Sequence, residues 1–196
     1  MRPPSPVAAT LLGLQRAGAF DALIVEPEGR RARVGVIFLH GYAGSFTVEC
    51  WHFVRAARAI GALKVCPSMD ASGEWWRPDG VAIVDATLRY MASRGVSRVV
   101  LAGLSNGAVG AHRIARRFAP RLAGLVLISG ASAFGSSAGV PTLVVRGTDD
   151  ALGRSAIREP EWSEFTIAGG HFVFLSRADA VRDAIARWLV THVGAS

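Results

Sequence analysis

A serine stands between two glycines at residues 103–107, which read Gly-Leu-Ser-Asn-Gly. The residues before it, 97–103, form an aliphatic and β-branched run, and those after it, 106–120, favour a helix. A serine on such a strand-to-helix turn is held in a strained conformation that exposes its hydroxyl, while the glycines let strand and helix approach closely. The start of the helix favours developing negative charge. The pattern therefore predicts that Ser105 is a nucleophile.

A serine hydroxyl needs a base that takes its proton before it can attack. His171 follows the two glycines that end the apolar run 161–169. Two carboxylates, Asp149 and Asp150, come directly after the run 141–147 and one threonine. The resulting chain order of serine, aspartate and histidine is one of the known orders of a catalytic triad.

Acyl transfer also needs two backbone N–H groups that point at the oxygen of the reacting carbonyl. The N–H of Asn106, directly after the serine, is the first candidate. The second is expected in the loop His40-Gly41-Tyr42-Ala43-Gly44, whose glycines allow the backbone to turn its N–H groups inward.

Seven apolar runs and four longer helical patterns could position these residues. Such alternation predicts an α/β domain with a mostly parallel sheet and helices on both faces. Ligands of these sheets gather beyond the carboxyl ends of the strands. The first two runs are expected to pair as an antiparallel hairpin at one edge, with Gly29 in the turn. The expected strands are 22–27, 33–40, 62–68, 97–103, 122–130, 141–147 and 161–169, and the expected helices are 45–61, 81–95, 106–120 and 177–193.

Three motifs, "LHGYAG", "GLSNG" and "GTDD…GGH", occur in this order between about residues 34 and 192. With them the chain resembles serine hydrolases of the α/β-hydrolase fold. It is most similar to the small, lid-poor carboxylesterases, thioesterases and dienelactone-hydrolase-like proteins. Many relatives carry a helical cap where this chain has only "ASAFGSSAG" at 131–139, so the resemblance implies a minimal cap or none. Dienelactone hydrolases proper use a cysteine nucleophile, so that specific activity is not implied.

The resemblance also implies a role for each matched residue. Ser105 is the nucleophile, His171 the base and an aspartate its partner, with Asp150 favoured over Asp149 by its distance from the preceding glycine. Tyr42 provides the second oxyanion N–H, with Ala43 as the alternative.

The implied activity is hydrolysis of a small-molecule carboxylic ester or thioester through an acyl-enzyme, with no metal and no cofactor. An acyltransferase on the same triad and a non-catalytic binding protein of the fold are the alternatives. Trp75 and Trp76, in a loop at the functional edge, either line the substrate pocket or cover the core.

Charge and hydropathy bear on the class of partner. The formal net charge is +7, and Lys64 is the one lysine in the chain. The arginines are scattered and do not alternate with aromatic residues, which argues against a nucleic-acid surface. No run approaches the length of about 18 apolar residues that a membrane-spanning helix needs. We expect a single domain over 1–196.

The compartment depends on the first residues and on the two cysteines. Residues 1–20 read as an amphipathic helix or as a weak export signal. A disulfide between Cys50 and Cys66 would suit an oxidising compartment, but two separately buried thiols are slightly favoured. We therefore expect a cytoplasmic protein, with export as the alternative.

The remaining histidines and tryptophans have plainer interpretations. His40 is expected to be structural, with its ring bonded to nearby backbone. Surface or packing roles are expected for His52, His112 and His192, and core positions for Trp51, Trp162 and Trp188.

Overall fold

The computed structural model of the protein describes residues 20–27, 32–43, 46–153 and 158–194. The expected N-terminal helix or export signal at 1–20 lies outside them, apart from Phe20. All the strands described form one seven-stranded sheet in the order β1-β3-β2-β4-β5-β6-β7. The strands are β1 (Ala22–Val25), β2 (Val34–Leu39), β3 (Leu63–Pro67), β4 (Arg98–Leu104), β5 (Leu122–Ile128), β6 (Thr142–Gly147) and β7 (Trp162–Ile167).

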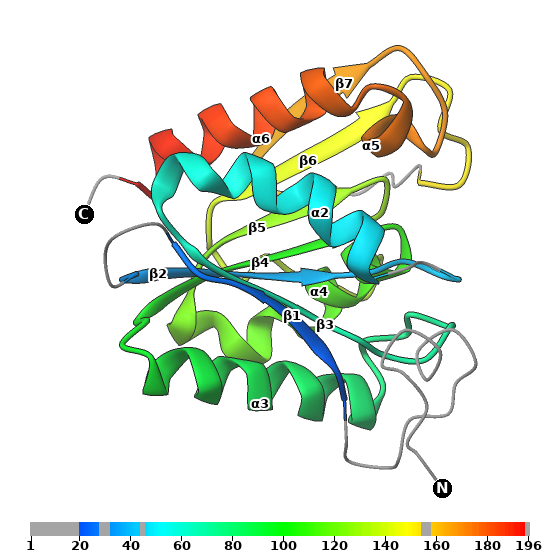
Figure 1. The fold of residues 1–196 in the computed structure, drawn as a ribbon. Coiled ribbons are helices and arrows are strands. Elements are labelled where there is room, and N and C mark those ends of the chain that lie inside the picture. The colour runs from blue at the N-terminus through cyan, green and yellow to red at the C-terminus, as the bar shows by residue number, and fades with distance from the viewer. Residues whose placement is uncertain (1–19, 28–31, 44–45, 154–157, 195–196) are drawn as a thin grey trace, which may run out of the picture.

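Helices cover both faces of the sheet (Figure 1), as the strand–helix alternation predicts. They are α2 (Phe46–Ala56), α3 (Pro78–Ser93), α4 (Asn106–Phe118), α5 (Val173–Ser176) and α6 (Ala178–His192), with short 3-10 turns at Ala57–Ile60 and Ala119–Arg121. The sequence patterns found all of these except the single turn α5, which is too short to show a helical period.

The core has two parts because successive side chains of a strand point to opposite faces. In β2, Val36 and Phe38 pack beneath α2 and α6. Ile37 and Leu39 pack beneath α3 and α4. The central strands are therefore apolar on both faces, which explains their continuous hydrophobic runs.

The expected hairpin between the first two strands is wrong. β1 pairs antiparallel with β3, from Ala22 opposite Pro67 to Val25 opposite Lys64. β2 is flanked instead by two parallel neighbours, β3 and β4. Both edges of β2 are thus paired with neighbouring strands. The short β1 pairs instead with the outer edge of β3.

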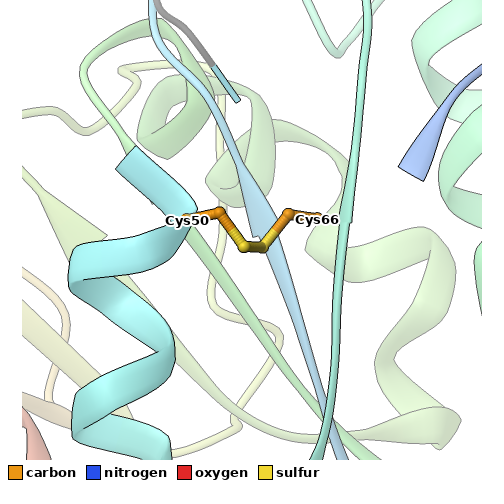
Figure 2. Close-up of a disulfide and its surroundings, with 2 residues drawn as sticks. All are labelled: Cys50 and Cys66. Carbon is orange, nitrogen blue, oxygen red and sulfur yellow. A yellow bond between two sulfur atoms is a disulfide. The ribbon is translucent and has the colours of Figure 1, made fainter. Parts of the chain in front are cut away.

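A disulfide joins Cys50 in α2 to Cys66 in β3, so the expectation of two separate thiols is wrong (Figure 2). The Cα atoms lie 6.0 Å apart, within the usual range for a disulfide. Both cysteines lie in the core between α2 and the sheet, where burial and pairing are compatible. Spacing along the chain could not reveal this, because the contact depends on how helix and strand pack.

Trp51, beside the disulfide, is also not where the sequence analysis expected it. It is 59% exposed, whereas Trp188 is buried and Trp162 is half-buried. The buried apolar side chains on either side of it in α2 include Cys50, Phe53 and Val54, at the spacing of one helical face. Trp51 lies off that face.

Candidate active site

Ser105 stands between the last residue of β4 and the first of α4, in a conformation that few non-glycine residues adopt. Its φ is 53° and its ψ is −119°. The backbones around it are close, because a Cβ atom at Gly107 would lie 2.1 Å from the carbonyl oxygen of Leu39. A Cβ atom at Gly103 would lie 2.3 Å from the carbonyl carbon of Gly107. The two glycines therefore allow the tight turn that holds the serine in this strained state.

Three side chains from distant parts of the chain form one hydrogen-bonded row. His171 Nε2 lies 2.9 Å from Ser105 Oγ, and His171 Nδ1 lies 2.9 Å from Asp150 Oδ1. The carboxylate accepts the Nδ1–H, which leaves the lone pair of Nε2 facing the serine hydroxyl. This is the geometry in which an imidazole can take a proton from serine.

Asp150, rather than Asp149, is the carboxylate that contacts the histidine. Its side chain is buried, and its Oδ1 also accepts the N–H of Gly153 at 2.7 Å. Asp149 is exposed to solvent. The buried and hydrogen-bonded position fixes the Asp150 carboxylate relative to the imidazole, as the family spacing implies.

Two residues at the end of β5, which the sequence analysis did not single out, support the row. Ser129 is buried with a φ of 50°, and its hydroxyl donates to the carbonyl oxygen of His171 at 2.8 Å. A Cβ atom at Gly130 would lie 2.6 Å from the carbonyl oxygen of Ser105. Their position at the carboxyl end of a strand beside β4 was the one signal that could have found them.

The two expected oxyanion donors are the N–H groups of Asn106 and Tyr42. Asn106 is the first residue of α4, so its N–H has no acceptor within the helix. A Cβ atom at Gly41 would lie 3.2 Å from Ser105 Cβ, which brings the loop of Tyr42 directly against the serine. The N–H of Ala43 donates to the Ala71 carbonyl at 2.7 Å. Ala43 is therefore occupied, and Tyr42 remains the candidate for the second donor.

Solved structures resemble this arrangement of strands and helices over most of their length. Est1E from Butyrivibrio proteoclasticus, solved with bound ferulic acid, matches at a TM-score of 0.73 and 15% identity, over 91% of this chain and 98% of that one. A serine hydrolase without a lid from Xanthomonas campestris matches at a TM-score of 0.70 and 21% identity, over 92% of each chain. An enol-lactonase from Burkholderia xenovorans matches at a TM-score of 0.66 and 13% identity, over 87% of this chain and 96% of that one.

The protein has the α/β-hydrolase fold. No protein-family model and no curated protein matches the chain. At these sequence identities the structural likeness describes the fold, and the site has to be interpreted from its own residues.

The α/β-hydrolase fold of this protein carries no helical cap at the expected insertion point. Residues 129–141 join β5 to β6 and contain no helix. Phe134, within this connection, is among the most exposed large apolar residues that the structure describes.

Trp75 is a core residue, so the hypothesis that it lines a substrate pocket is wrong. It is fully buried, and its indole N–H donates to the carbonyl oxygen of His40 at 2.9 Å. Gly80 and Gly110 make room for it, since a Cβ atom at either would lie within 2.6 Å of Trp75. Trp75 thus binds the backbone at the start of the loop that contains Gly41 and Tyr42.

Trp76 is half-buried and lies under the guanidinium of Arg113 in α4, 4.7 Å from the ring centroid. Its proposed place in the pocket stays a prediction.

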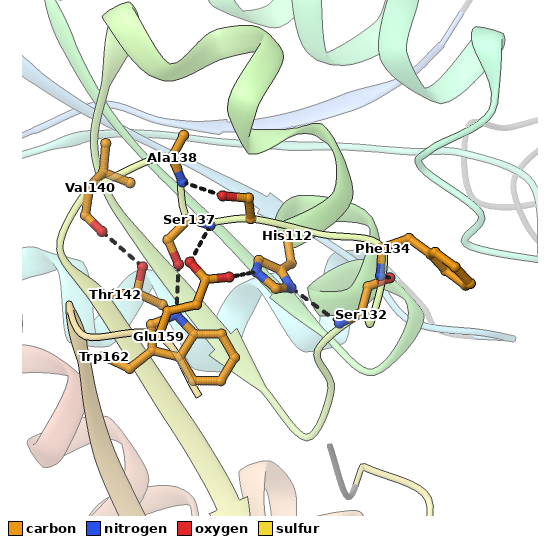
Figure 3. A network of polar contacts seen from close by, with 10 residues as sticks. His112, Ser132, Phe134, Ser137, Ala138, Val140, Thr142, Glu159 and Trp162 are labelled. Atoms are coloured by element: carbon orange, nitrogen blue, oxygen red, sulfur yellow. Dashed lines mark hydrogen bonds and ion pairs between the residues drawn. The ribbon is translucent and has the colours of Figure 1, made fainter. Parts of the chain in front are cut away.

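His112 is a packing residue, one of the two roles that the sequence analysis expected, and it has a hydrogen-bond partner that the sequence did not reveal. It is fully buried in α4, and its Nε2 lies 2.9 Å from Glu159 Oε1 (Figure 3). The other carboxylate oxygen accepts the N–H of Ser137, whose hydroxyl accepts the indole N–H of Trp162. Burial alone would raise the pKa of Glu159, but the hydrogen bonds from Ser137 and His112 lower it overall. This network ties the β5–β6 connection to the start of β7.

In the part of the chain that the structure describes, no three His, Cys, Asp or Glu side chains gather as metal ligands would. No helix within those residues is long and apolar enough to cross a membrane.

Proposed function

We propose that this protein is a serine hydrolase that cleaves a carboxylic ester or thioester through an acyl-enzyme. The observation that carries the proposal is the row Ser105–His171–Asp150, with both contacts at 2.9 Å and the serine on a strained turn. A strained nucleophile beside an oriented base is costly to build and marks catalytic rather than structural serines.

In the proposed mechanism, Ser105 Oγ attacks the carbonyl carbon while His171 Nε2 takes its proton. Asp150 Oδ1 holds the Nδ1–H and stabilises the imidazolium that forms. The tetrahedral intermediate carries a negative oxygen, which accepts hydrogen bonds from the N–H groups of Asn106 and Tyr42. The first N–H also lies at the positive end of the α4 helix dipole.

Collapse of the intermediate expels the alcohol or thiol, which takes the proton from His171 Nε2. Ser105 is then acylated. Water attacks the acyl-enzyme by the same path in reverse, with His171 as base, and releases the carboxylic acid.

The surroundings of the row favour a small or protruding acyl group. The β5–β6 connection is short and has no helix. Tyr42, in the loop of Gly41, and Phe172, next to His171, are largely exposed, and the Phe172 ring lies edge-on to His171 at 5.4 Å between centroids. Such an open, partly apolar edge accepts a substrate from solvent without a closing cap. The names of the structural neighbours, among them a lid-less serine hydrolase and an enol-lactonase, agree with this class.

Labelling with a fluorophosphonate probe tests the proposal directly. The folded wild type should be labelled at one serine, and Ser105→Ala should abolish labelling. His171→Ala should slow it by about 10³-fold, because the base is lost. Ser93→Ala, at the exposed end of α3, is the matched control and should label like the wild type.

A panel of p-nitrophenyl esters and acyl thioesters then defines the acyl group, and product analysis with added alcohols separates hydrolysis from acyl transfer. A folded wild type that neither labels nor turns over any of these substrates would refute the proposed activity.

We further propose that the protein works in an oxidising compartment, the alternative to the cytoplasmic expectation. The Cys50–Cys66 disulfide supports this, because such bonds seldom persist in the reducing cytosol. The test is to trap thiols in the native host and count modified cysteines by mass spectrometry after denaturation. Two trapped thiols would contradict the proposal, and two that react only after reduction would support it.

A further inference from the structure

Glu49 is a buried carboxyl in the first turn of α2 that takes no part in the row of Ser105, His171 and Asp150. Its side chain is 9% exposed. Burial raises the pKa of Glu49 to about 7, and a hydrogen bond from the Gly41 backbone lowers it in part. A carboxyl that is costly to ionise in the core weakens the fold, so its presence calls for a contribution other than stability.

The hydrogen bond of Glu49 reaches the loop that contacts the candidate nucleophile. Its Oε2 accepts the N–H of Gly41 at 3.1 Å. Gly41 packs against the end of β4, where an added Cβ atom would lie 3.0 Å from the Leu104 carbonyl oxygen and 3.2 Å from Ser105 Cβ. Glu49 therefore holds the backbone of Gly41, which packs against Ser105 and precedes Tyr42.

The next peptide group along the chain holds the Tyr42 N–H. Its carbonyl oxygen, that of Gly41, lies 2.9 Å from His40 Nδ1. The N–H of Met69 donates to His40 Nε2, so Nδ1 carries the proton and donates to Gly41. In a trans peptide the C=O and N–H point in opposite directions, so this bond directs the Tyr42 N–H away from the His40 ring. Glu49 holds the N–H of the preceding peptide, so the two hydrogen bonds fix consecutive peptide groups on either side of the Gly41 Cα atom.

The helix turn that carries Glu49 is itself fastened to the sheet. The adjacent residue, Cys50, forms the disulfide to Cys66 in β3 (Figure 2). The carboxylate therefore projects from a covalently anchored position, and it can constrain Gly41 rather than follow it.

We propose that Glu49 is a positioning residue for the oxyanion hole, whose carboxylate holds the Gly41 N–H and so directs the Tyr42 N–H toward the oxyanion formed at Ser105. This proposal rests on the proposed hydrolase function. Glu49 touches no reacting atom and acts through the backbone between Gly41 and Tyr42.

The test compares Glu49→Leu, which removes the acceptor, with Glu49→Gln, which keeps an oxygen in the same place. An oxyanion hydrogen bond strengthens in the transition state, so its loss lowers kcat more than it changes KM. On p-nitrophenyl butyrate we expect Glu49→Leu to lower kcat by about 10- to 100-fold with KM changed less than about threefold. Glu49→Gln should keep kcat within about threefold of the wild type.

Val48→Ala, on the exposed side of the same helix turn, is the matched control and should leave both constants unchanged. Glu49→Asp keeps the charge but shortens the side chain by one methylene, so it should lower kcat as Glu49→Leu does. It replaces Glu49→Leu if that variant fails to fold.

The outcomes separate this proposal from the proposed function. If the wild type shows no Ser105-dependent turnover or labelling, the hydrolase function itself fails. If the wild type is active and folded Glu49→Leu or Glu49→Asp keeps its kcat, Glu49 does not position the oxyanion hole. Equal losses of kcat in Glu49→Gln and Glu49→Leu would also overturn the proposal, because the acceptor oxygen would then not be what matters.

Discussion

Among the residues that the structure describes, two carboxylate–histidine pairs have the same hydrogen-bond length, and only one of them belongs to a candidate active site. Asp150 contacts His171 at 2.9 Å, and Glu159 contacts His112 at 2.9 Å. The difference lies at the second ring nitrogen. That of His171 faces the hydroxyl of Ser105, whereas that of His112 accepts the backbone N–H of Ser132.

The comparison indicates that an oriented imidazole does not by itself mark a candidate active site. His112 is fully buried, and the hydrogen bonds of its ring end on protein groups, so it stabilises the path of the β5–β6 connection. His171 is partly exposed, and its Nε2 contacts the hydroxyl of Ser105, a serine on a strained turn. The Glu159–His112 pair stabilises the fold, whereas the Asp150–His171 pair orients the base of the proposed mechanism.

The largest effect is expected from breaking the catalytic pair. His171→Ala should lower kcat/KM by about 10³-fold or more, because the serine loses its base. Its unfolding free energy should also fall, by about 1–3 kcal/mol, because the buried Asp150 carboxylate loses its imidazole partner. A variant that stays folded cannot owe a 10³-fold loss of turnover to this change. Ester turnover and urea unfolding measure the two quantities, with His192→Ala as the control. A variant that keeps a tenth of the activity would show that another group acts as base.

Breaking the structural pair should lower stability but leave turnover nearly unchanged. His112→Leu keeps the volume but leaves the Glu159 carboxylate and the Ser132 N–H without the imidazole, at a cost of about 2–4 kcal/mol in unfolding free energy. The kcat of the folded fraction should stay within about threefold of the wild type. Urea unfolding and turnover at a temperature where the variant is folded provide the check. A 100-fold loss of kcat at unchanged stability would place this pair in the chemistry.

Glu49 is a buried carboxyl with no imidazole bonded to it. For this residue we expect a contribution to the unfolding free energy that depends on pH. Its pKa is raised from 4.5 to about 7 in the folded state. The protonated form therefore contributes stability that is complete below pH 4.5 and is lost as the pH rises through 7. The unfolding free energy of Glu49→Gln minus that of the wild type should grow by about 2–3 kcal/mol between pH 4.5 and pH 8. Denaturant titrations across this range measure it, and a constant difference would mean that Glu49 ionises as easily as in water.

The smallest effect is expected at an exposed acid–base pair. Asp85 and Arg89 form an ion pair one turn apart on α3, with side chains 36% and 66% exposed. Solvent screens such a pair, so Asp85→Asn should change the unfolding free energy by less than about 0.5 kcal/mol and leave turnover unaltered. A loss as large as that of His112→Leu would show that burial is not what separates these pairs.

Much of the candidate site could be predicted from the sequence because its members follow strands. Ser105, Asp150 and His171 each come shortly after an apolar run, and parallel strands deliver their carboxyl ends to one edge. The Asn106 N–H follows from the same turn. The residues beneath them could not be predicted this way. Ser129 reads as the end of a strand, and Glu49 as a polar residue in an amphipathic helix.

The missed elements share a physical cause, which is that they depend on contacts between segments rather than on local pattern. The pairing of β1 with β3 was decided by which strand edge remained open. The contrast between His112 and His171 was decided by which groups surround each ring. Trp75 followed the same rule, since its loop position suggested a pocket and packing against Gly80 and Gly110 made it core.

The sequence by itself determined the alternation of strands and helices, the tight turn at Ser105 and the order of the three side chains, because periodicity and glycine placement act locally. Tertiary structure alone decided the strand order, the disulfide between Cys50 and Cys66, and the hold of Glu49 on Gly41. Each of these joins atoms that are distant along the chain, and only the packing of helices on the sheet brings them within bonding distance.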